Sequence, residues 1–306
     1  MEIVYSLAPG ITTTPVLLTM GKFDGLHRGH QALIETVVER AGQLGFRSAV
    51  LTWEPHPAAV LRPDQPLQLL TSLEERIELM SGSGLDLLIV APFTTETKST
   101  SAEDYMGQIC AAIPLRELWV GEGFAMGRGR SGDVPSLMVI GRELGFSVGT
   151  ITPVMIDGAP VSSSRVRELL RAGNVEAVVG LLGRPFGLRG EVIEGDKRGR
   201  QIGFPTANMR ISSNHVLPAD GVYACRVYLN GEGLPAVTNI GVRPTFDGVR
   251  HAVEPHLLDW SGDLYGQSIR VEFLHRLRGE QKFNGIDALV AQIKKDANQA
   301  RELLIG

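Results

Sequence analysis

The stretch GKFDGLHRGHQALIETVVER, residues 21–40, joins a glycine-rich turn to an amphipathic helical pattern. It follows the apolar run VLLTM (16–20), which predicts a buried strand. Glycine lets the backbone approach a ligand closely, and the start of a helix offers unpaired N–H groups at the positive end of its dipole. This strand, turn and helix therefore predict a parallel α/β domain with a phosphate site at the turn.

The turn carries two histidines, His27 and His30, in the first turn of the predicted helix. Either ring could give phosphate oxygens a hydrogen bond or a positive charge, which would stabilise the charge that builds up when an α-phosphate is attacked. A single histidine here would more often be a capping or buried residue, and the pair is what favours a phosphate site. The spacing H-x-x-H also suits zinc, but no third ligand follows at a recognisable spacing.

Short apolar runs alternate with helical patterns up to about residue 183. This alternation predicts βαβ units on a parallel sheet, and hence a Rossmann-like domain. Serine or asparagine opens the last two helices of this part and glycine ends them. The predicted strands are 16–20, 48–53, 86–93, 118–121 and 146–154, and the predicted helices are 30–45, 73–84, 134–145, 163–173 and 174–183.

Beyond the turn GRPFG (183–187) the pattern changes to short β-rich segments separated by Gly, Pro, Asn and Asp. These segments predict a closed antiparallel barrel. A final helix is predicted over 285–304, and its apolar stripe should pack on the barrel. We therefore expect two domains, 1–183 and 184–306, which suits a chain of 306 residues.

Composition and charge exclude several classes of protein. Hydrophobic residues make up 43% and charged residues 21% of the chain, which is typical of a globular protein. The net charge is −4, with 14 Lys and Arg against 20 Asp and Glu up to residue 183 and 16 against 14 beyond it, so we expect no nucleic-acid binding. No run spans a membrane and no secretory signal opens the chain, so we expect a cytoplasmic protein. Cys110 and Cys225 lack CxxC spacing, which argues against disulfides and structural zinc.

The first half carries two motifs of a known family. GKFDGLHRGH (21–30) is similar to GxFDGxHxGH, a signature of nucleotidyltransferases that move an adenylyl or cytidylyl group, and VSSSRVRELL (161–170) resembles their second signature, ISSTxIR. Alone, the second stretch would be interpreted as an N-capped surface helix. The resemblance implies that His27, His30 and Arg165 act in catalysis. It implies ATP contacts from Gly21, Phe23, Asp24, Gly25, Gly29, Ser162, Ser163, Ser164 and Arg167.

The second half resembles riboflavin kinase. GDKRGRQIGFPTAN (195–208) is similar to that family's ATP-phosphate loop and PTAN element, and VEPHLLDWSGDLYG (253–266) is similar to its catalytic strand. The resemblance implies that Glu254 orients or deprotonates the riboflavin 5′-hydroxyl, and that Thr206 and Asn208 help to hold Mg²⁺, which prefers oxygen ligands. Pro255 could bend this strand or place it at a sheet edge. The implied ATP contacts are Gly195, Lys197, Arg198, Gly199, Gly203 and Pro205.

A third motif concerns the flavin. TWEPHP (52–57) resembles the first family's T-F-D/E-P-H-P stretch, which implies that Pro55 and His56 lie near the flavin. Gly123 is another expected flavin-site position, but it stands where an Asp or Asn is usual. Met126 stands where Phe is common, and residues 92–105 are more polar than usual. Losing a positioned polar contact costs roughly 2–4 kcal/mol of transition-state stabilisation, so these departures predict slower adenylylation.

Together the motifs resemble the bifunctional prokaryotic riboflavin kinase/FAD synthetase family over nearly the whole chain. The resemblance implies that the second domain phosphorylates riboflavin to FMN and that the first joins FMN to ATP, giving FAD and pyrophosphate, with Mg²⁺ in both steps. The alternatives are a riboflavin kinase with a degenerate flavin-binding first domain, which Gly123 favours, another adenylyl or cytidylyl transferase, and a flavin sensor without catalysis. The sequence leaves the oligomeric state, the preferred metal and the relative rates of the two steps open.

Overall fold

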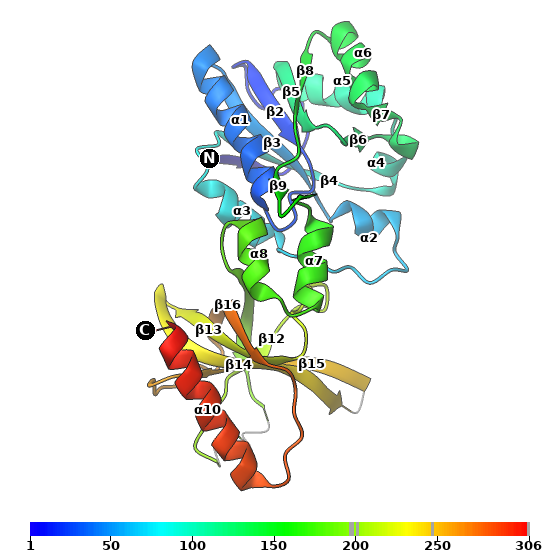
Figure 1. The fold of residues 1–306 in the computed structure, drawn as a ribbon. Coiled ribbons are helices and arrows are strands. Elements are labelled where there is room, and N and C mark those ends of the chain that lie inside the picture. Colours follow the sequence, from blue (N-terminus) through cyan, green and yellow to red (C-terminus); the bar gives the residue numbers. More distant parts are fainter. Residues whose placement is uncertain (196–198, 200–201, 246–247, 305–306) are drawn as a thin grey trace. The chain divides into compact units, whose positions relative to one another are not determined.

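The computed structural model describes residues 1–195, 199, 202–245 and 248–304 (Figure 1). It divides into two compact units, Met1–Ser163 and Ser164–Gly306. The boundary between these units lies earlier in the chain than the one expected from the sequence, after residue 183. The difference arises because α7 (Ser163–Arg171) and α8 (Val175–Leu182) group with the barrel.

The first unit is built on a six-stranded parallel sheet in the order β1-β4-β3-β2-β5-β8 (Figure 1). All five residues of β2 are buried, and this strand lies between β3 and β5. After β2, the chain adds β3 and β4 on one side of this strand and later β5 and β8 on the other. The carboxyl ends of β2 and β5 therefore form a switch point, where such sheets bind ligands. The strands are Glu2–Val4 (β1), Val16–Met20 (β2), Arg47–Glu54 (β3), Leu87–Pro92 (β4), Leu115–Gly121 (β5) and Ser147–Ile151 (β8).

Helices cover both faces of this sheet. Leu33 of α1 and Met80 of α3 belong to one core, while Met106 of α5 and Leu137 of α6 belong to the other. The predicted α/β fold is confirmed, although the sequence patterns had not predicted α5. The helices are Arg28–Leu44 (α1), Pro57–Leu61 (α2), Leu73–Ser81 (α3), Thr95–Ser99 (α4), Ala102–Ala112 (α5) and Val134–Leu144 (α6), with hairpins at Ala125–Met126 and Gly132–Asp133 (β6, β7) and at Met155–Ile156 and Ala159–Pro160 (β9, β10).

Two helices, α7 (Ser163–Arg171) and α8 (Val175–Leu182), precede the barrel. Asn174 caps α8 by accepting a hydrogen bond from the Ala177 N–H at 3.1 Å, and Gly183 ends it with a φ of 73°, as predicted. Arg276 of the barrel donates to the carbonyl of Ala172 at 3.0 Å, and its own N–H donates to the Glu176 carboxylate at 2.9 Å. These bonds explain why both helices belong to the second unit.

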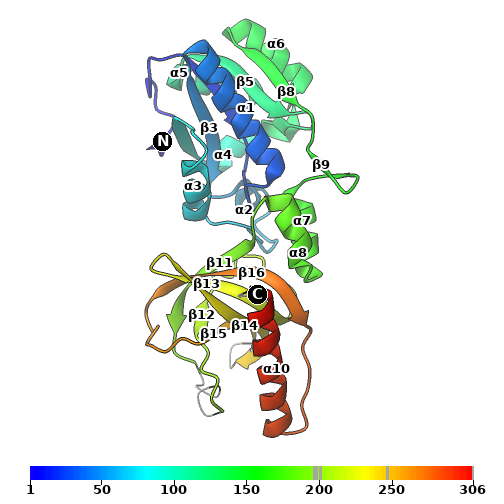
Figure 2. The ribbon, with the colours of Figure 1, turned by 60° about the vertical axis from the view of Figure 1, so that its left-hand side comes forward.

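The second unit is the predicted closed antiparallel barrel, in the order β11-β12-β15-β14-β13-β16 (Figure 2). Pro255 does not mark an edge: it pairs with Thr238 on β14, and two residues earlier Val253 pairs with Met209 on β12. The strand therefore has a neighbour on both sides. The strands are Phe186–Ile193 (β11), Asn208–Arg210 (β12), Gly221–Leu229 (β13), Glu232–Thr245 (β14), Gly248–Leu257 (β15) and Ser268–Arg278 (β16).

The terminal helix α10 (Ile286–Leu304) is confirmed, and its second half packs on the barrel. Ala297 and Ala300 are buried against barrel residues, and Arg278 of β16 pairs with the Asp296 carboxylate at 2.9 Å. Ile286 is 66% exposed, so the predicted apolar stripe is not buried along its whole length.

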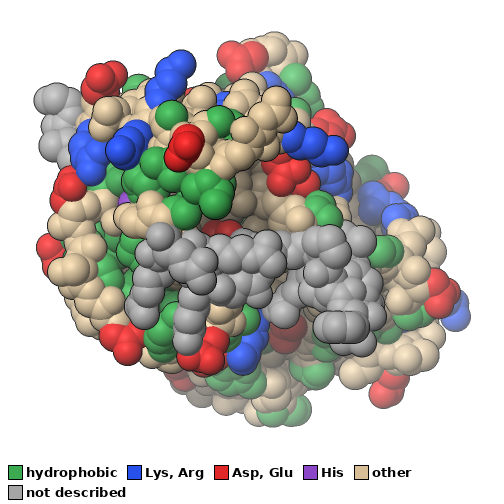
Figure 3. Space-filling view, turned by 90° about the horizontal axis from the view of Figure 1, so that it is seen from below, with side chains coloured by type: hydrophobic (Ala, Val, Ile, Leu, Met, Phe, Trp, Pro, Cys, Tyr) green, Lys and Arg blue, Asp and Glu red, His purple; other side chains and the backbone are tan. Residues whose placement is uncertain are grey.

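Charges of both signs are interspersed on the face of the molecule seen in Figure 3. Within the described ranges, no helix combines the length and the apolar character needed to cross a membrane.

Candidate active sites

The loop between β2 and α1 turns sharply at the switch point of the parallel sheet. Phe23, Gly25 and Leu26 have positive φ angles of 51°, 80° and 38°. A Cβ on Gly25 would lie 2.7 Å from Leu70 Cδ1, so both the backbone angle and the packing require glycine. Gly21 faces the Phe23 ring, which is fully buried beneath the loop. Left-handed angles at non-glycine residues persist only where surrounding contacts hold them, as they do at many ligand sites.

His27 and His30 lie against each other at the start of α1. His27 is the N-cap residue, because its Nδ1 accepts from the His30 N–H at 3.4 Å and its carbonyl accepts from the same group at 2.8 Å. The two rings are stacked with centroids 3.7 Å apart. A Cβ on Gly29 would lie 3.2 Å from the His27 ring, so glycine leaves room for the stack. The capping role of His27 is therefore observed, and its part in binding phosphate stays a prediction.

His30 is held in its neutral form. Desolvation by burial, followed by the charges of His27 and Lys22, lowers the pKa of His30 well below its usual value. Its Nδ1 is buried and has no hydrogen-bond partner in the described part of the chain. A neutral imidazole still carries one N–H, so this ring would serve an anion as a hydrogen-bond donor rather than as a cation.

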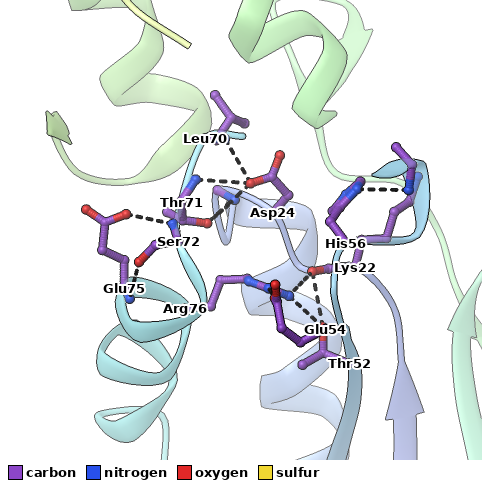
Figure 4. Close-up of polar contacts among 12 residues, drawn as sticks. Lys22, Asp24, Thr52, Glu54, His56, Leu70, Thr71, Ser72, Glu75 and Arg76 are labelled. Atoms are coloured by element: carbon purple, nitrogen blue, oxygen red, sulfur yellow. Dashed lines mark hydrogen bonds and ion pairs between the residues drawn. The ribbon is translucent and has the colours of Figure 1, made fainter. Parts of the chain in front are cut away.

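Asp24 ties the loop to the segment that precedes α3 (Figure 4). Its carboxylate is buried and accepts from the N–H groups of Leu70 and Thr71 at 2.9 and 3.0 Å. The Thr71 hydroxyl in turn accepts from the Gly25 N–H at 2.9 Å, and Ser163 Oγ donates to the Asp24 carbonyl at 2.8 Å. The structure thus places Asp24 and Ser163, both predicted to contact ATP, where they order the loop.

Arg76 is a functional candidate that the sequence interpretation missed. It lies on α3 and donates to the Lys22 carbonyl at 3.0 Å, to Thr52 Oγ1 at 2.9 Å and to Glu54 Oε2 at 2.7 Å (Figure 4). A signal was present in the sequence: position 76 falls on the inward stripe of the helix, four residues before the buried Met80.

Two further loops leave the same edge of the sheet, since β2, β3 and β5 are parallel neighbours. Pro55 follows Glu54 through a cis peptide bond, and His56 is buried with its Nδ1 accepting from the Ala58 N–H at 3.1 Å. His56 therefore caps α2. Gly123 follows β5, is exposed, and has nothing within 4 Å of the place where a Cβ would stand. A polar side chain would fit there.

The second serine and arginine signature is divided between the two units. Ser162 and Ser163 end the first unit, while Ser164, Arg165 and Arg167 belong to the second. Both arginines are half-buried on α7. Their part in adenylylation stays a prediction.

The barrel site is formed where the PTAN element runs beside β15. The Ala207 N–H donates to the Pro255 carbonyl at 2.8 Å, and His256 Nδ1 lies 2.7 Å from the Pro205 carbonyl oxygen. Glu254 is buried on β15, at the position that pairs with Asn239 on β14. Strand pairing therefore brings the predicted catalytic glutamate next to the predicted metal-binding segment.

The glycines of the phosphate loop pack on the same segment. A Cβ on Gly195 would lie 2.2 Å from the Asn208 Nδ2, and one on Gly199 would lie 2.3 Å from the Phe204 carbonyl oxygen. Gly203 has a φ of 85°. These positions need glycine for the loop to close on PTAN. Lys197 and Arg198, which were predicted to contact ATP phosphates, lie outside the described residues.

The oxygen donors at this site fit Mg²⁺. Thr206 is exposed and Asn208 is half-buried, so both side chains are accessible. In the portion of the chain that the structure describes, no group of three or more His, Cys, Asp or Glu side chains could hold a metal ion. Hydroxyl and amide oxygens with few carboxylates suit an ion that keeps several waters and is shared with the phosphates of ATP.

The fold and the two sites define the class of protein. The first unit is a Rossmann-like α/β domain of the nucleotidyltransferase type, and the second is a barrel of the riboflavin kinase type with a terminal helix. Family models agree: one for FAD synthetase matches residues 11–165, and one for riboflavin kinase matches residues 182–304.

Curated relatives extend this match over most of the chain. The bifunctional riboflavin kinase/FMN adenylyltransferase of Escherichia coli K12 is 38% identical over 288 residues, which cover 94% of this chain and 92% of the relative. The proteins of the same description from Pseudomonas fluorescens and Bacillus subtilis are 40% and 36% identical, covering 93% of this chain and 92% and 91% of their own. The chain belongs to the bifunctional riboflavin kinase/FMN adenylyltransferase family.

A solved structure shares the whole fold. The crystal structure of a Streptococcus pneumoniae protein, described as a macrolide-efflux protein, is 29% identical and matches with a TM-score of 0.90 over 98% of each chain.

Proposed function

We propose that this chain converts riboflavin to FMN and FMN to FAD, each step consuming one ATP. The observation that carries the proposal is that each family model falls on the part of the chain that holds the corresponding site, with the histidine loop in the first and PTAN with Glu254 in the second. The riboflavin kinase match begins at residue 182, which supports our proposal that the kinase domain begins near residue 184. The proposed partners are small molecules only, and we place the reaction in the cytoplasm, where ATP is available.

In the kinase step, the riboflavin 5′-oxygen forms a bond to the γ-phosphorus of ATP, and the bond to the bridging oxygen of ADP breaks. Glu254 accepts the hydroxyl proton, and its place on a paired strand holds the carboxylate in one position. Thr206 and Asn208 would hold Mg²⁺, which supplies positive charge to the phosphates. Gly195, Gly199 and Gly203 let the backbone wrap these phosphates, with Lys197, Arg198 and Pro205 as further ATP contacts.

In the adenylyl transfer step, a phosphate oxygen of FMN forms a bond to the α-phosphorus of ATP, and pyrophosphate leaves. His27 and His30, at the start of α1, donate hydrogen bonds to the oxygens on which negative charge increases. Arg165, Arg167 and the serines beside them would contact the triphosphate, as the second signature implies. Pro55 and His56 would line the flavin side.

The experiment that tests this proposal supplies the purified chain with Mg-ATP and either riboflavin or FMN, and separates the products by chromatography. We expect FMN and then FAD from riboflavin, and FAD from FMN. Formation of FMN without FAD would instead support a riboflavin kinase with a degenerate first domain, which the bifunctional descriptions of the relatives do not favour. Excess EDTA should stop both reactions and added Mg²⁺ should restore them.

A further inference from the structure

Arg76 is a buried cation beneath the edge of the sheet where the histidine loop and the flavin-side loop begin. Its side chain is 2% exposed. An ionised group taken out of water is costly unless it is paired and hydrogen-bonded, and Arg76 meets this condition with three acceptors: the Lys22 carbonyl, Thr52 Oγ1 and Glu54 Oε2. These bonds offset the cost of burying the cation and hold it against the three groups.

The three acceptors come from two parts of the chain: Lys22 from the loop after β2, and Thr52 and Glu54 from the end of strand β3. Lys22 belongs to the loop after β2, five residues before His27, and Glu54 ends β3, two residues before His56. One planar guanidinium fixes the directions of all its bonds, so it sets the position of the histidine loop relative to the end of β3, where the flavin-side loop begins. Figure 4 shows α3 presenting Arg76 to both.

The helix that carries Arg76 is itself firmly placed. Ser72 and Glu75 form a capping box at its start, with bonds of 3.2 and 2.7 Å. Just before it, Leu70 and Thr71 bind the Asp24 carboxylate. The histidine loop is thus held to the α3 segment at two points, through Asp24 and through Arg76, whereas the flavin-side loop is held at Glu54.

We propose that Arg76 is a positioning residue for FMN adenylylation, which sets the distance between the loop that carries His27 and the loop that carries His56. The inference rests on the proposed adenylylation. Arg76 acts through Lys22 and Glu54 and touches neither substrate. In this role the cation holds the triphosphate side of the site at a fixed position relative to the flavin side. A small displacement of either side would misalign the attacking oxygen and the α-phosphorus.

The test compares Arg76→Met, Arg76→Lys and Glu54→Gln with the wild-type chain. We expect Arg76→Met to lower kcat/KM for FAD formation by about 100-fold, the scale of a misplacement of about 1 Å. Arg76→Lys keeps the charge but not the fork, and should lower it by about 10-fold. Glu54→Gln should raise the KM for FMN by roughly 5-fold and leave the KM for ATP unchanged, because it loosens only the flavin-side loop.

A matched control is Arg40→Met. Arg40 also makes a two-bond pair with a glutamate in the same unit, Glu117 on β5, with its Nη2 2.7 Å from Oε1. This variant should leave FAD formation within about 2-fold of wild type, since its pair joins no substrate loop. FMN formation from riboflavin should stay unchanged in all the variants.

The double variant Arg76→Met/Glu54→Gln gives the sharpest readout. Since Arg76 acts on the flavin loop through Glu54, the double variant should have the same KM for FMN as Arg76→Met alone. The inference would be overturned if the two substitutions had additive effects on the KM for FMN. It would also be overturned if Arg76→Lys and Arg76→Met left the rate of FAD formation unchanged, or if Arg40→Met lowered that rate as much as Arg76→Met. If Arg76→Met does not fold, the kinetics of Arg76→Lys and Glu54→Gln test the inference. A wild-type chain that forms no FAD would overturn the proposed function instead, and the inference with it.

Discussion

The two sites are ordered by different parts of the chain. At the edge of the parallel sheet, side chains hold the loops: Asp24 binds two backbone N–H groups, Arg76 joins the histidine loop to the end of β3, and His27 caps a helix. In the barrel, strand pairing and backbone hydrogen bonds, together with the contact of His256 Nδ1 with the Pro205 carbonyl, hold PTAN beside Glu254, while Thr206 stays exposed. Changes to supporting side chains should therefore impair the first site more than the second, in which strand pairing provides most of the support.

The strongest test of this contrast is Glu254→Gln. The amide keeps the shape of the side chain but cannot accept the hydroxyl proton, so FMN formation should fall by about 10³-fold, within the range for a positioned general base. FAD formation from supplied FMN should persist. Both are measured by chromatography of the flavins.

The matched control is Glu272→Gln on β16, another barrel-strand carboxylate, which pairs with Arg270 at 2.8 Å. It should retain FMN formation. Undiminished phosphorylation by Glu254→Gln would remove the assigned role of Glu254.

The histidine variants test the first site. His27→Ala and His30→Ala should each lower FAD formation by about 10²-fold, because each removes a donor aimed at developing charge. His27→Ala also removes the cap of α1, so its effect should be the larger. FMN formation serves as the internal measurement.

His275→Ala is the control, since this half-buried histidine lies on the barrel, 3.7 Å from Glu176. It should leave FAD formation unchanged. A parallel fall of both activities in His27→Ala and His30→Ala would indicate misfolding rather than a catalytic loss.

The sequence could predict features whose residues lie close together in the chain, but not contacts between residues far apart in it. The histidine loop was predictable because strand, glycine turn and helix start all lie within residues 16–30, and PTAN because its motif is continuous. The partners of Asp24 lie 46 and 47 residues away, and the Arg76 bond to Lys22 spans 54, so no local pattern reveals them. The same limit explains why the sequence revealed neither the structural partners of Asp24 nor the role of Arg76, while the ATP contact of Asp24 stays a prediction.

Because the pKa of His30 is lowered in the folded chain, we expect the stability of the first unit to depend on pH. In the unfolded chain His30 takes up a proton near the ordinary histidine pKa of about 6.5, whereas in the folded chain its pKa is lower, chiefly through desolvation and then through His27 and Lys22. As the pH falls below about 6.5, the unfolded state therefore binds more protons and folding is weakened; above that value the contribution of His30 is constant.

His30→Asn cannot titrate, so its stability should fall less than that of the parent between about pH 7.5 and 5.5, a window that brackets the ordinary histidine pKa. Urea midpoints followed by tryptophan fluorescence in a Trp260→Phe background would measure this, since the other two of the three tryptophans, Trp53 and Trp119, lie in the first unit. The same slope in both chains would show that the proton uptake belongs to another group.

The smallest expected effect is a gain at Gly123. The site there is open, with nothing within 4 Å of a Cβ and an ordinary backbone angle, so Asp or Asn should enter without strain. One exposed hydrogen bond contributes about 0.5–1.5 kcal/mol, so Gly123→Asp or Gly123→Asn should raise kcat/KM for FAD formation by about 2-fold to 10-fold. Gly42→Asp, at an equally open position near the far end of α1, adds the same charge and should change nothing. If neither variant at 123 alters the rate, the departure at this position does not limit adenylylation, and the side chains that order the histidine loop set the rate instead.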